Sequence, residues 1–418
     1  MTVRSRTRTP AAPDLTQVDV EALSDRYQEP QWLRDRRLAA WELYETLPMP
    51  TTSDEAWRRT DYRRIRWPEA GRLLTPDGRA DLDVIPAHHY APLLGDQQGG
   101  LVAFVDANLA AAQLADALAE QGVIFTDLHT AVRDVGDLVQ AHLMTRAVLP
   151  EDGKFAALHA ALWTHGVFLY IPRGRSVALP LHSVFYPVSP GLTLGHILIV
   201  LEDGAEVTYM HEYASPTLEA HSAFVGATEF LLGEGANLRY VALQNWGDNM
   251  YEFSHQRARV GRDGNLDWVN GTMGGRLTKV FMELDLDGEG SSGRMSGFYF
   301  ADGARLMDHD TQQNHNAPHT TSDLLFKGAL TDRARSVWQG MIVVRPGAQK
   351  TDGFQANRNL ILSKEARADS IPGLEIQADD VRCTHAATLS KLDEEPIFYL
   401  MSRGLPRREA EKLAVDGF

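Results

Sequence analysis

One corner motif recurs along the middle of the chain, and it constrains the fold more than any other feature of the sequence. Residues 201–207 read LEDGAEV, with Gly204 at the centre. Similar segments follow at 232–238, 260–266, 300–306 and 344–349, the last being the weakest copy. Gly235 lies 31 residues after Gly204, and Gly264 lies 29 residues after Gly235. Because glycine adopts turn conformations that other residues avoid, each copy predicts a tight corner.

Between the corners, apolar residues alternate with polar ones. In residues 279–287, Val280, Met282, Leu284 and Leu286 fall on one face, and the other face is charged apart from Phe281. A period of two is typical of a strand. Similar runs occupy residues 196–201, 206–213, 229–232, 238–243 and 298–300. Short strands between recurrent corners predict a β-solenoid, in which each coil buries its inner face on the next. A β-sandwich is the alternative, but it does not require recurrent corners.

The two ends of the chain have a different texture. Residues 1–150 are predicted to form a mainly helical N-terminal domain, with helices from Pro30 to Pro48, over 107–120 and over 127–145. Residues 151–390 form the predicted β-helix core. Residues 391–418 are predicted to form two short helices, one ending at Gly404 and one starting at Pro406. The apolar residues of this last segment must dock on the solenoid, on a partner or on both.

Charge and cysteine content exclude several classes of function. The chain has 41 Lys and Arg against 56 Asp and Glu, a net charge of −15. This argues against general nucleic-acid binding and against attraction to anionic membranes. The single cysteine, Cys383, excludes an intrachain disulfide and an all-cysteine metal site. The longest apolar runs, 167–171 and 197–201, are far shorter than the roughly 18 residues that cross a bilayer. We therefore expect a cytoplasmic protein.

Two further motifs have ordinary structural interpretations. Residues 288–293 match G-x-G-x-x-G, but a strand-like segment follows where a dinucleotide site needs a helix, so we interpret the motif as a solenoid corner. A basic loop is interpreted as a solvated, partly paired surface. It contains Arg58, Arg59, Arg63, Arg64 and Arg66.

A histidine-rich segment spans residues 309–319. His309, His315 and His319 are six and four residues apart, so an unbroken strand would place all three on one face. With Asp310, they could bind iron or zinc. Against this, Pro318 breaks a strand, and polar ladders are also common at solenoid corners.

The segment Cys383-Thr384-His385 is the most specific pair. Two residues apart on a strand, Cys383 and His385 share one face, and the histidine could lower the pKa of the thiol. Nucleophilic catalysis and thiolate ligation both use such a pair. The alternative is a small buried cysteine beside a hydrogen-bonded histidine.

The same segment carries a family resemblance. Residues 374–388 (LEIQADDVRCTHAAT) and 397–405 (IFYLMSRGL) resemble the signature of the SufB/SufD family of iron–sulfur cluster assembly proteins. Further matching segments are 29–33, 56–61, 315–322, 327–328, 349–352 and 357–360. Within the family the chain is most similar to the SufD type, because no cysteine occurs near residues 368–370. Ala386 replaces a glycine that is usual in the family.

The resemblance implies a mainly β protein with a right-handed parallel β-helix core, flanked by N-terminal and C-terminal helical domains. It implies a non-catalytic scaffold subunit that pairs with a SufB-like sister subunit through the β-helix and with a SufC-like ABC ATPase through the C-terminal helices. Cys383 and His385 would lie at the sister interface, with His385 the better ligand for iron or a transient iron–sulfur cluster. The implied ATPase-docking residues are Phe398, Leu400, Met401, Arg403, Gly404 and Leu405.

The resemblance implies no cofactor tightly bound by the single chain, and a second copy of the chain is a further candidate partner. Two other hypotheses stay open. One is a stand-alone β-solenoid enzyme acting on carbohydrate, with Asp285 and Asp287 on an exposed strand face. The other is a metal-dependent enzyme centred on His309, His315 and His319.

Overall fold

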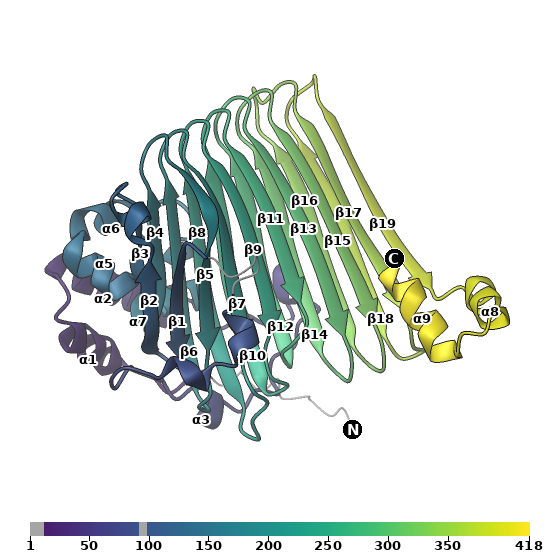
Figure 1. Cartoon of the computed structure of the whole chain (residues 1–418), viewed down its shortest axis with the longest axis horizontal. Helices are drawn as coiled ribbons and strands as arrows, with labels where there is room; N and C mark the ends of the chain where they lie inside the picture. The colour runs from purple at the N-terminus through teal and green to yellow at the C-terminus, as the bar shows by residue number, and fades with distance from the viewer. Residues whose placement is uncertain (1–11, 92–97) are drawn as a thin grey trace, which may run out of the picture.

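The computed structural model describes residues 12–91 and 98–418, and most of them belong to two facing β-sheets (Figure 1). The ten-stranded sheet contains, in spatial order, β2 (Asn108–Leu114), β1 (Gly100–Val105), β5 (Ser176–Tyr186), β7 (Glu206–Ala214), β9 (Asn237–Asn245), β11 (Asn265–Thr272), β13 (Ser292–Ala301), β15 (Thr321–Leu330), β17 (Asp352–Ile361) and β19 (Arg382–Lys391). The nine-stranded sheet contains β3 (Ile124–Asp127), β4 (His165–Ile171), β6 (Leu192–Leu201), β8 (Ser222–Leu232), β10 (Met250–Val260), β12 (Leu277–Leu286), β14 (Leu306–His315), β16 (Arg335–Val344) and β18 (Arg367–Ile376).

The chain passes alternately between the sheets, so each coil contributes one strand to each. From β4 and β5 onward, every strand pairs in parallel with the strand two places later in the chain. This connectivity is that of a β-solenoid, and it excludes the β-sandwich alternative. The predicted strands are confirmed, including the alternation in β12.

The corner motif occurs at both sides of the solenoid. Copies at 201–207, 232–238, 260–266 and 344–349 connect the nine-stranded sheet to the ten-stranded sheet, whereas the copy at 300–306 lies at the opposite corner. Gly204, Gly235 and Gly303 have φ between 59° and 67°, as the turns require. In the copy at 260–266, Asp263 takes this conformation, with φ 51°, in place of Gly264.

The G-x-G-x-x-G segment is a corner between β12 and β13, as expected. Gly288 is required there because a Cβ would lie only 1.9 Å from the backbone nitrogen of Arg262 on the preceding coil. No helix follows the motif, so it does not build a dinucleotide site.

Seven α-helices in the described residues precede or interleave with the first strands. They are α1 (Gln17–Tyr27), α2 (Gln31–Thr46), α3 (Trp67–Ala70), α4 (Asp116–Ala119), α5 (Leu128–Asp134), α6 (Gly136–His142) and α7 (Lys154–Leu162). The predicted helix after Pro30 is confirmed as α2. The helix predicted over 107–120 is wrong for half of that segment, which is β2 and pairs antiparallel with β1; only α4 is helical there. The helix predicted over 127–145 is divided into α5 and α6 at Val135, whose φ of −135° interrupts it.

The N-terminal helices cover the outer face of the first strands of the nine-stranded sheet. Phe155 of α7 stacks on Phe253 of β10, with ring centroids 4.1 Å apart. A buried ion pair fixes α2 in this layer: Arg37 contacts Glu29 at 2.7 Å and donates to the carbonyl oxygens of Ala161 and Trp163. These first coils are therefore packed on both faces of the sheet.

Along the inner face of the ten-stranded sheet, one residue from each coil lines up in register. We call this set the central row. It consists of Leu181, Tyr209, Tyr240, Trp268, Met295, Leu324, Gln355 and His385. After Leu181, the row changes from aromatic to aliphatic to polar residues toward the C-terminus. Its members up to Gln355 are buried, and His385 is exposed.

The chain ends in two helices beyond the last coil, α8 (Glu394–Ser402) and α9 (Arg407–Asp416), which lie at the opposite end of the solenoid from α1–α7 (Figure 1). Ile397 and Ala410 are buried, and Arg407 joins the helices through Glu394 at 2.6 Å. The two short helices predicted within residues 391–418 are thus confirmed. The domain limits at residues 150 and 390 stay predictions. Among residues 12–91 and 98–418, no helix is both long and apolar enough to span a bilayer.

Candidate functional site

The last coil, formed by β18 and β19, is the exposed end of the solenoid. Each of these strands is the terminal strand of its sheet, so one of its edges has no strand partner among the described residues. Three inward-facing apolar side chains of this coil are exposed because no further coil covers them. They are Leu374, Ile376 and Leu389, with exposed fractions of 37%, 43% and 61%. Unpaired edges next to exposed apolar residues form a surface suited to another chain.

Cys383 and His385 lie on the inner face of β19, at this open end. Cys383 is in register with Gly353 of β17, and His385 is in register with Gln355, the preceding member of the central row. Gln355 is fully buried, which shows that this face points into the solenoid. Cys383 is half-buried and His385 is exposed. The structure thus brings the two predicted residues onto one accessible face, as their spacing implied.

The thiol of Cys383 has a less reactive environment than the sequence suggested. Burial raises its pKa above the ordinary value, and the nearby Asp352 carboxylate adds to this, against an opposing hydrogen bond with the Gly353 backbone. The expectation that His385 lowers this pKa is therefore wrong in direction. Cys383 is a protonated thiol in the isolated chain at neutral pH, packed near Ile342 and Val344.

A second histidine approaches Cys383 from inside the solenoid. A Cβ placed on Gly353 would lie 3.3 Å from Nε2 of His315 and 3.4 Å from Sγ of Cys383, so both flank the same glycine. His315 is fully buried and contacts Thr320 Oγ1 at 2.7 Å and Ser322 Oγ at 2.9 Å. Burial lowers its pKa to about 4, so it is neutral at physiological pH.

The sequence pattern grouped His315 with the wrong neighbours. The 30-residue separation between Gly353 and Cys383 is one coil, and this spacing could have placed Cys383 beside Gly353. It gives no position for His315, which lies on the other sheet. His309 instead stacks on Tyr299, with centroids 5.4 Å apart, and contacts Thr272 Oγ1 at 3.0 Å.

The three histidines of residues 309–319 do not form a metal centre. Burial lowers the pKa of His309 to about 3, and His319 lies in the corner after β14 with φ 58°. In the part of the chain that the structure describes, no group of three or more His, Cys, Asp or Glu side chains is arranged to hold a metal ion. The hypothesis of an enzyme centred on these histidines is therefore wrong for the chain by itself.

The acidic residues proposed for carbohydrate chemistry are engaged in ion pairs. Asp285 is only 7% exposed and accepts a hydrogen bond of 2.6 Å from Asn314. Asp287 follows the end of β12 and pairs with Arg259 at 2.6 Å. These carboxylates do not lie on an exposed strand face, in contrast to the expectation.

The interior behind His385 is polar. The buried Nε2 of Gln355 donates to the carbonyl oxygens of Gly340 and Gly373, and its Oε1 has no hydrogen-bond partner among residues 12–91 and 98–418. Beside it, Asn357 and Asn359 are bonded to each other at 2.6 Å, and Tyr299 donates to Asn359 at 2.5 Å. This polar interior was not predicted from the sequence, and neither was the position of His315 beside Cys383.

The C-terminal helices carry a second uncovered apolar surface. Phe398, Tyr399 and Met401 of α8 are 73%, 56% and 41% exposed, and Leu413 of α9 is 49% exposed. Of the six predicted docking residues, Phe398, Met401, Arg403 and Gly404 are exposed, and Leu400 and Leu405 are half-buried. Gly404 has φ 95°, the left-handed conformation expected of a helix end.

Comparison with known families identifies the family to which this chain belongs. Residues 188–418 match the family model "SUF system FeS cluster assembly, SufBD core domain", and residues 21–182 match "SufBD protein N-terminal region". The chain belongs to the SufBD family. It is 33% identical over 408 residues to the iron–sulfur cluster assembly protein SufD of Bacillus subtilis, covering 96% of this chain and 91% of that protein.

It is also 29% identical to SufBD family proteins of Staphylococcus epidermidis and Staphylococcus aureus, covering 97% of this chain and 88% of each. The resemblance expected from the sequence is thus confirmed, and the SufBD family places the chain in the SUF system of iron–sulfur cluster assembly.

Proposed function

We propose that this SufBD family member is a non-catalytic scaffold subunit of a cytoplasmic SUF assembly complex, and that the open last coil is its working surface. The observation that carries the proposal is the coincidence of three features on β18 and β19. These strands have unpaired edges, they expose inward-facing apolar residues, and they present Cys383 and His385 to the outside.

The proposed occupant of this surface is a SufB-like sister subunit. A partner with its own terminal strands would pair with the free edges and cover Leu374, Ile376 and Leu389. In isolation, the same surface could pair with a second copy of this chain. The surface of an acidic chain with a net charge of −15 supports neither nucleic-acid nor membrane binding as its role.

The iron–sulfur cluster is the cargo of this interface and is held only transiently. His385 is the better ligand because its imidazole is exposed, whereas Cys383 is half-buried with a raised pKa. One thiol and one imidazole cannot complete a cluster, so the sister subunit would supply the remaining thiolates. The single chain would therefore hold no cluster tightly.

A SufC-like ABC ATPase is the proposed partner of α8 and α9. Phe398, Leu400, Met401 and Leu405 offer an apolar surface at a helix pair that extends beyond the last coil (Figure 1). Arg403 lies over the ring of Tyr399 at 5.2 Å and leaves its charge at the rim of this surface. An apolar centre with a charged rim is typical of protein interfaces.

The first experiment replaces His385 in a complex co-expressed with SufB-like and SufC-like partners. His385→Ala should strongly reduce the iron and sulfide that the purified complex acquires, while subunit stoichiometry is unchanged. Thr384→Ala is the matched control, because Thr384 lies on the opposite face of the same strand. A normal cluster yield in His385→Ala would refute the ligand role.

The second experiment tests the ATPase dock. Phe398→Asp should abolish co-purification of the SufC-like ATPase without affecting recovery of the sister subunit. Val18→Asp is the control, since Val18 is 69% exposed on α1, at the opposite end of the solenoid from α8 and α9 (Figure 1). Equal retention of the ATPase by both variants would place the dock elsewhere.

A further inference from the structure

A basic pocket lies where the arginine-rich loop after α2 crosses the corners of the solenoid. It has a volume of about 440 Å³. Its charged lining comprises Arg59, Arg64, Arg276, Arg333, Arg335 and Asp61. The first two arginines and Asp61 belong to the loop, and the others belong to the corners that lead into β12 and β16.

The arginines of this pocket have few counter-charges. Asp61 is paired with Arg63 at 2.6 Å, and the one carboxylate near Arg335 in the described part of the chain is that of Asp369, at 3.7 Å. Arg59, Arg64, Arg276 and Arg333 have no carboxylate oxygen within 4.0 Å among the described residues. At longer range, Arg59 still interacts with Asp308 and Arg64 with Asp61. Five guanidinium groups against one carboxylate in the lining of one cavity are nevertheless unexpected in a chain with a net charge of −15.

One of these guanidinium groups is also left without a hydrogen-bond partner. Nη1 of Arg59 is buried and makes no hydrogen bond with any of the described residues. A buried charged donor without a partner destabilises the folded state, and negative charge in the adjoining cavity would offset part of that cost. The expectation that the basic loop is an ordinary solvated surface is therefore incomplete.

The loop holds its arginines in fixed positions. The hydroxyl of Thr60 donates to the buried carboxylate of Asp308 on β14, which also pairs with the buried Lys279 at 3.0 Å. Tyr62 is buried and donates to the carbonyl oxygen of Pro50 at 2.6 Å. Arg59 and Arg64 are thus carried by a segment anchored on both sides, facing corners that are rigidly stacked.

The corner arginines come from coils two places apart. Leu277, Leu306 and Arg335 are in register on successive strands, and Arg276 immediately precedes Leu277. With strands roughly 4.8 Å apart, these arginines span about 10 Å along the solenoid. A single carboxylate or phosphate is too small to engage both ends of that span together with the loop.

We propose that this pocket binds a small molecule that carries two or more linked phosphate groups. Guanidinium groups bind phosphate oxygens in bidentate fashion, and arginines from two sides can neutralise a polyphosphate that one residue could not. The volume lies within the usual range of small-ligand sites. The remaining wall, with Leu277, Leu306 and Tyr251, is apolar enough to accept an organic group attached to the phosphates. A long nucleic acid is disfavoured, because the rest of the acidic surface would repel it.

Titration of the full-length chain with inorganic pyrophosphate and, separately, with adenosine triphosphate tests this proposal by calorimetry. Saturable binding of either probe, weakened by added salt, is the expected result. If adenosine triphosphate binds more tightly than pyrophosphate, the apolar wall contacts the organic group. If the two probes bind equally, the phosphates alone are recognised. Either outcome supports the site. Absence of saturable binding at millimolar concentrations of both probes would overturn it.

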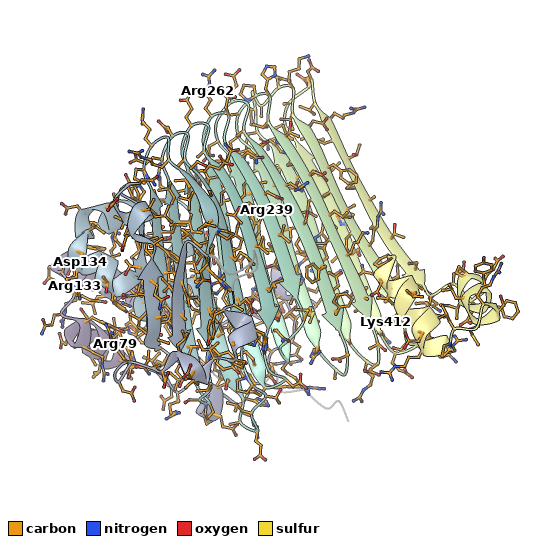
Figure 2. All side chains as sticks on the ribbon, viewed as in Figure 1. Arg79, Arg133, Asp134, Arg239, Arg262 and Lys412 are labelled. Carbon is orange, nitrogen blue, oxygen red and sulfur yellow. The ribbon has the colours of Figure 1, made fainter. Side chains whose placement is uncertain are left out.

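Variants locate the site on the protein. Arg276→Gln combined with Arg333→Gln should weaken binding about tenfold for each arginine, about 1.4 kcal/mol per substitution. The matched control combines Arg239→Gln with Arg262→Gln, which remove the same charge from exposed positions outside the pocket (Figure 2). Equal weakening in both pairs would overturn the assignment.

Arg276 and Arg333 are both exposed corner residues, so their replacement should leave the thermal midpoint unchanged. If Arg276→Gln lowers the thermal midpoint, the double variant Arg64→Gln with Arg333→Gln is used in place of Arg276→Gln with Arg333→Gln. This test uses the single chain and no cluster chemistry, so its failure would leave the proposed scaffold function untouched.

Discussion

The two ends of the central row share one backbone register but differ in almost every other respect. In the first coils, Tyr209 and Tyr240 stack with centroids 5.8 Å apart, and Trp268 follows, fully buried. In the last coils the same positions hold Gln355, with an unpaired oxygen, and the exposed His385. A repeating backbone therefore does not require a repeating interior. The aromatic end of the row stabilises the solenoid through burial, whereas the polar end exposes the imidazole of His385.

The outer faces of the first and last coils differ in the same way, because the first coils are covered and the last coil is exposed. Helix α7 covers the first strands of the nine-stranded sheet, where Phe155 stacks on Phe253, whereas the coil of β18 and β19 is exposed over much of its length. Burial of apolar area is the main stabilising term in folding, so local stability should fall along the solenoid toward the C-terminus.

The largest expected effect is at the aromatic end. Trp268→Ala should lower the free energy of unfolding by about 3–5 kcal/mol, because it leaves a cavity in a fully packed interior. The measurement is the urea midpoint followed by tryptophan fluorescence and circular dichroism. Leu389→Ala is the comparison at the open end, where a 61% exposed side chain should contribute less than about 0.5 kcal/mol. Similar losses for the two variants would break the comparison.

The next effect concerns a buried carboxyl group under α7. Burial raises the pKa of Glu229 to about 8, against hydrogen bonds from the backbone of Met144 and Val148, and its neighbour His196 lies 3.2 Å away. Folded Glu229 therefore keeps a proton that the unfolded chain releases above its ordinary pKa of 4.5. Stability should fall as pH rises from 4.5 through 8, by up to about 1.4 kcal/mol per pH unit.

Comparison with a variant between pH 6.5 and 8 separates this group from its histidine neighbours. Burial lowers the pKa of His196 to about 3 and that of His159 well below its ordinary value of 6.5, so both are neutral there when folded. Unfolded histidine still releases protons in the lower part of this window, but it does so in both proteins, so its contribution cancels in the difference between them. Across this window, Glu229→Gln should remove about 2 kcal/mol of pH dependence. Urea midpoints at the two pH values measure it, and an unchanged slope in the variant would exclude Glu229 as the cause.

A smaller effect is expected in the polar interior. Gln355→Leu removes a buried amide whose Oε1 is unpaired, which favours folding, but it also removes two donated hydrogen bonds. Because these effects oppose each other, the free energy of unfolding should change by less than about 1 kcal/mol. The prediction is checked by the urea midpoint, alongside cluster yield in the co-expressed complex. A loss as large as that of Trp268→Ala would show that the last coils are as tightly packed as the first.

The smallest effect on stability is expected at Leu389→Asp, within about 0.5 kcal/mol, because the side chain is exposed in the isolated chain. Its effect on assembly should be large, since a carboxylate would be buried at the proposed sister interface. Sedimentation velocity of the variant mixed with the sister subunit measures this. Normal pairing would exclude the open coil as the interface.

The repeating part of the fold was predictable because its signal is local. Corner residues such as Gly204 and the alternation around Val280 determine turns and strand faces without knowledge of distant contacts. The placement of Cys383 and His385 on one face followed from the same period of two. Their accessibility did not, because it depends on β19 being the terminal strand of its sheet.

The errors arose where tertiary pairing overrides local preference. Residues 108–114 are rich in alanine, a strong helix former, yet they form β2 because β1 offers a strand partner. The contact of His315 with the Cys383 region joins different coils and different sheets, so no local pattern reveals it. The meeting of Arg59 with Arg276 is equally non-local, because it depends on where a loop some 200 residues earlier crosses the corner.

The reversal of strand direction at the start of the solenoid has a consequence for the size of any assembly. There, β2 runs antiparallel to β1, and β3 runs antiparallel to β4. Arg79 also forms an isolated β-bridge with Leu109 of β2. These antiparallel strands do not continue the parallel ladder, whereas the free edges of β18 and β19 do. If two chains pair through their last coils as proposed, both of those edges are used, so we expect the β-helix contact to stop at a pair and not to extend into a fibre.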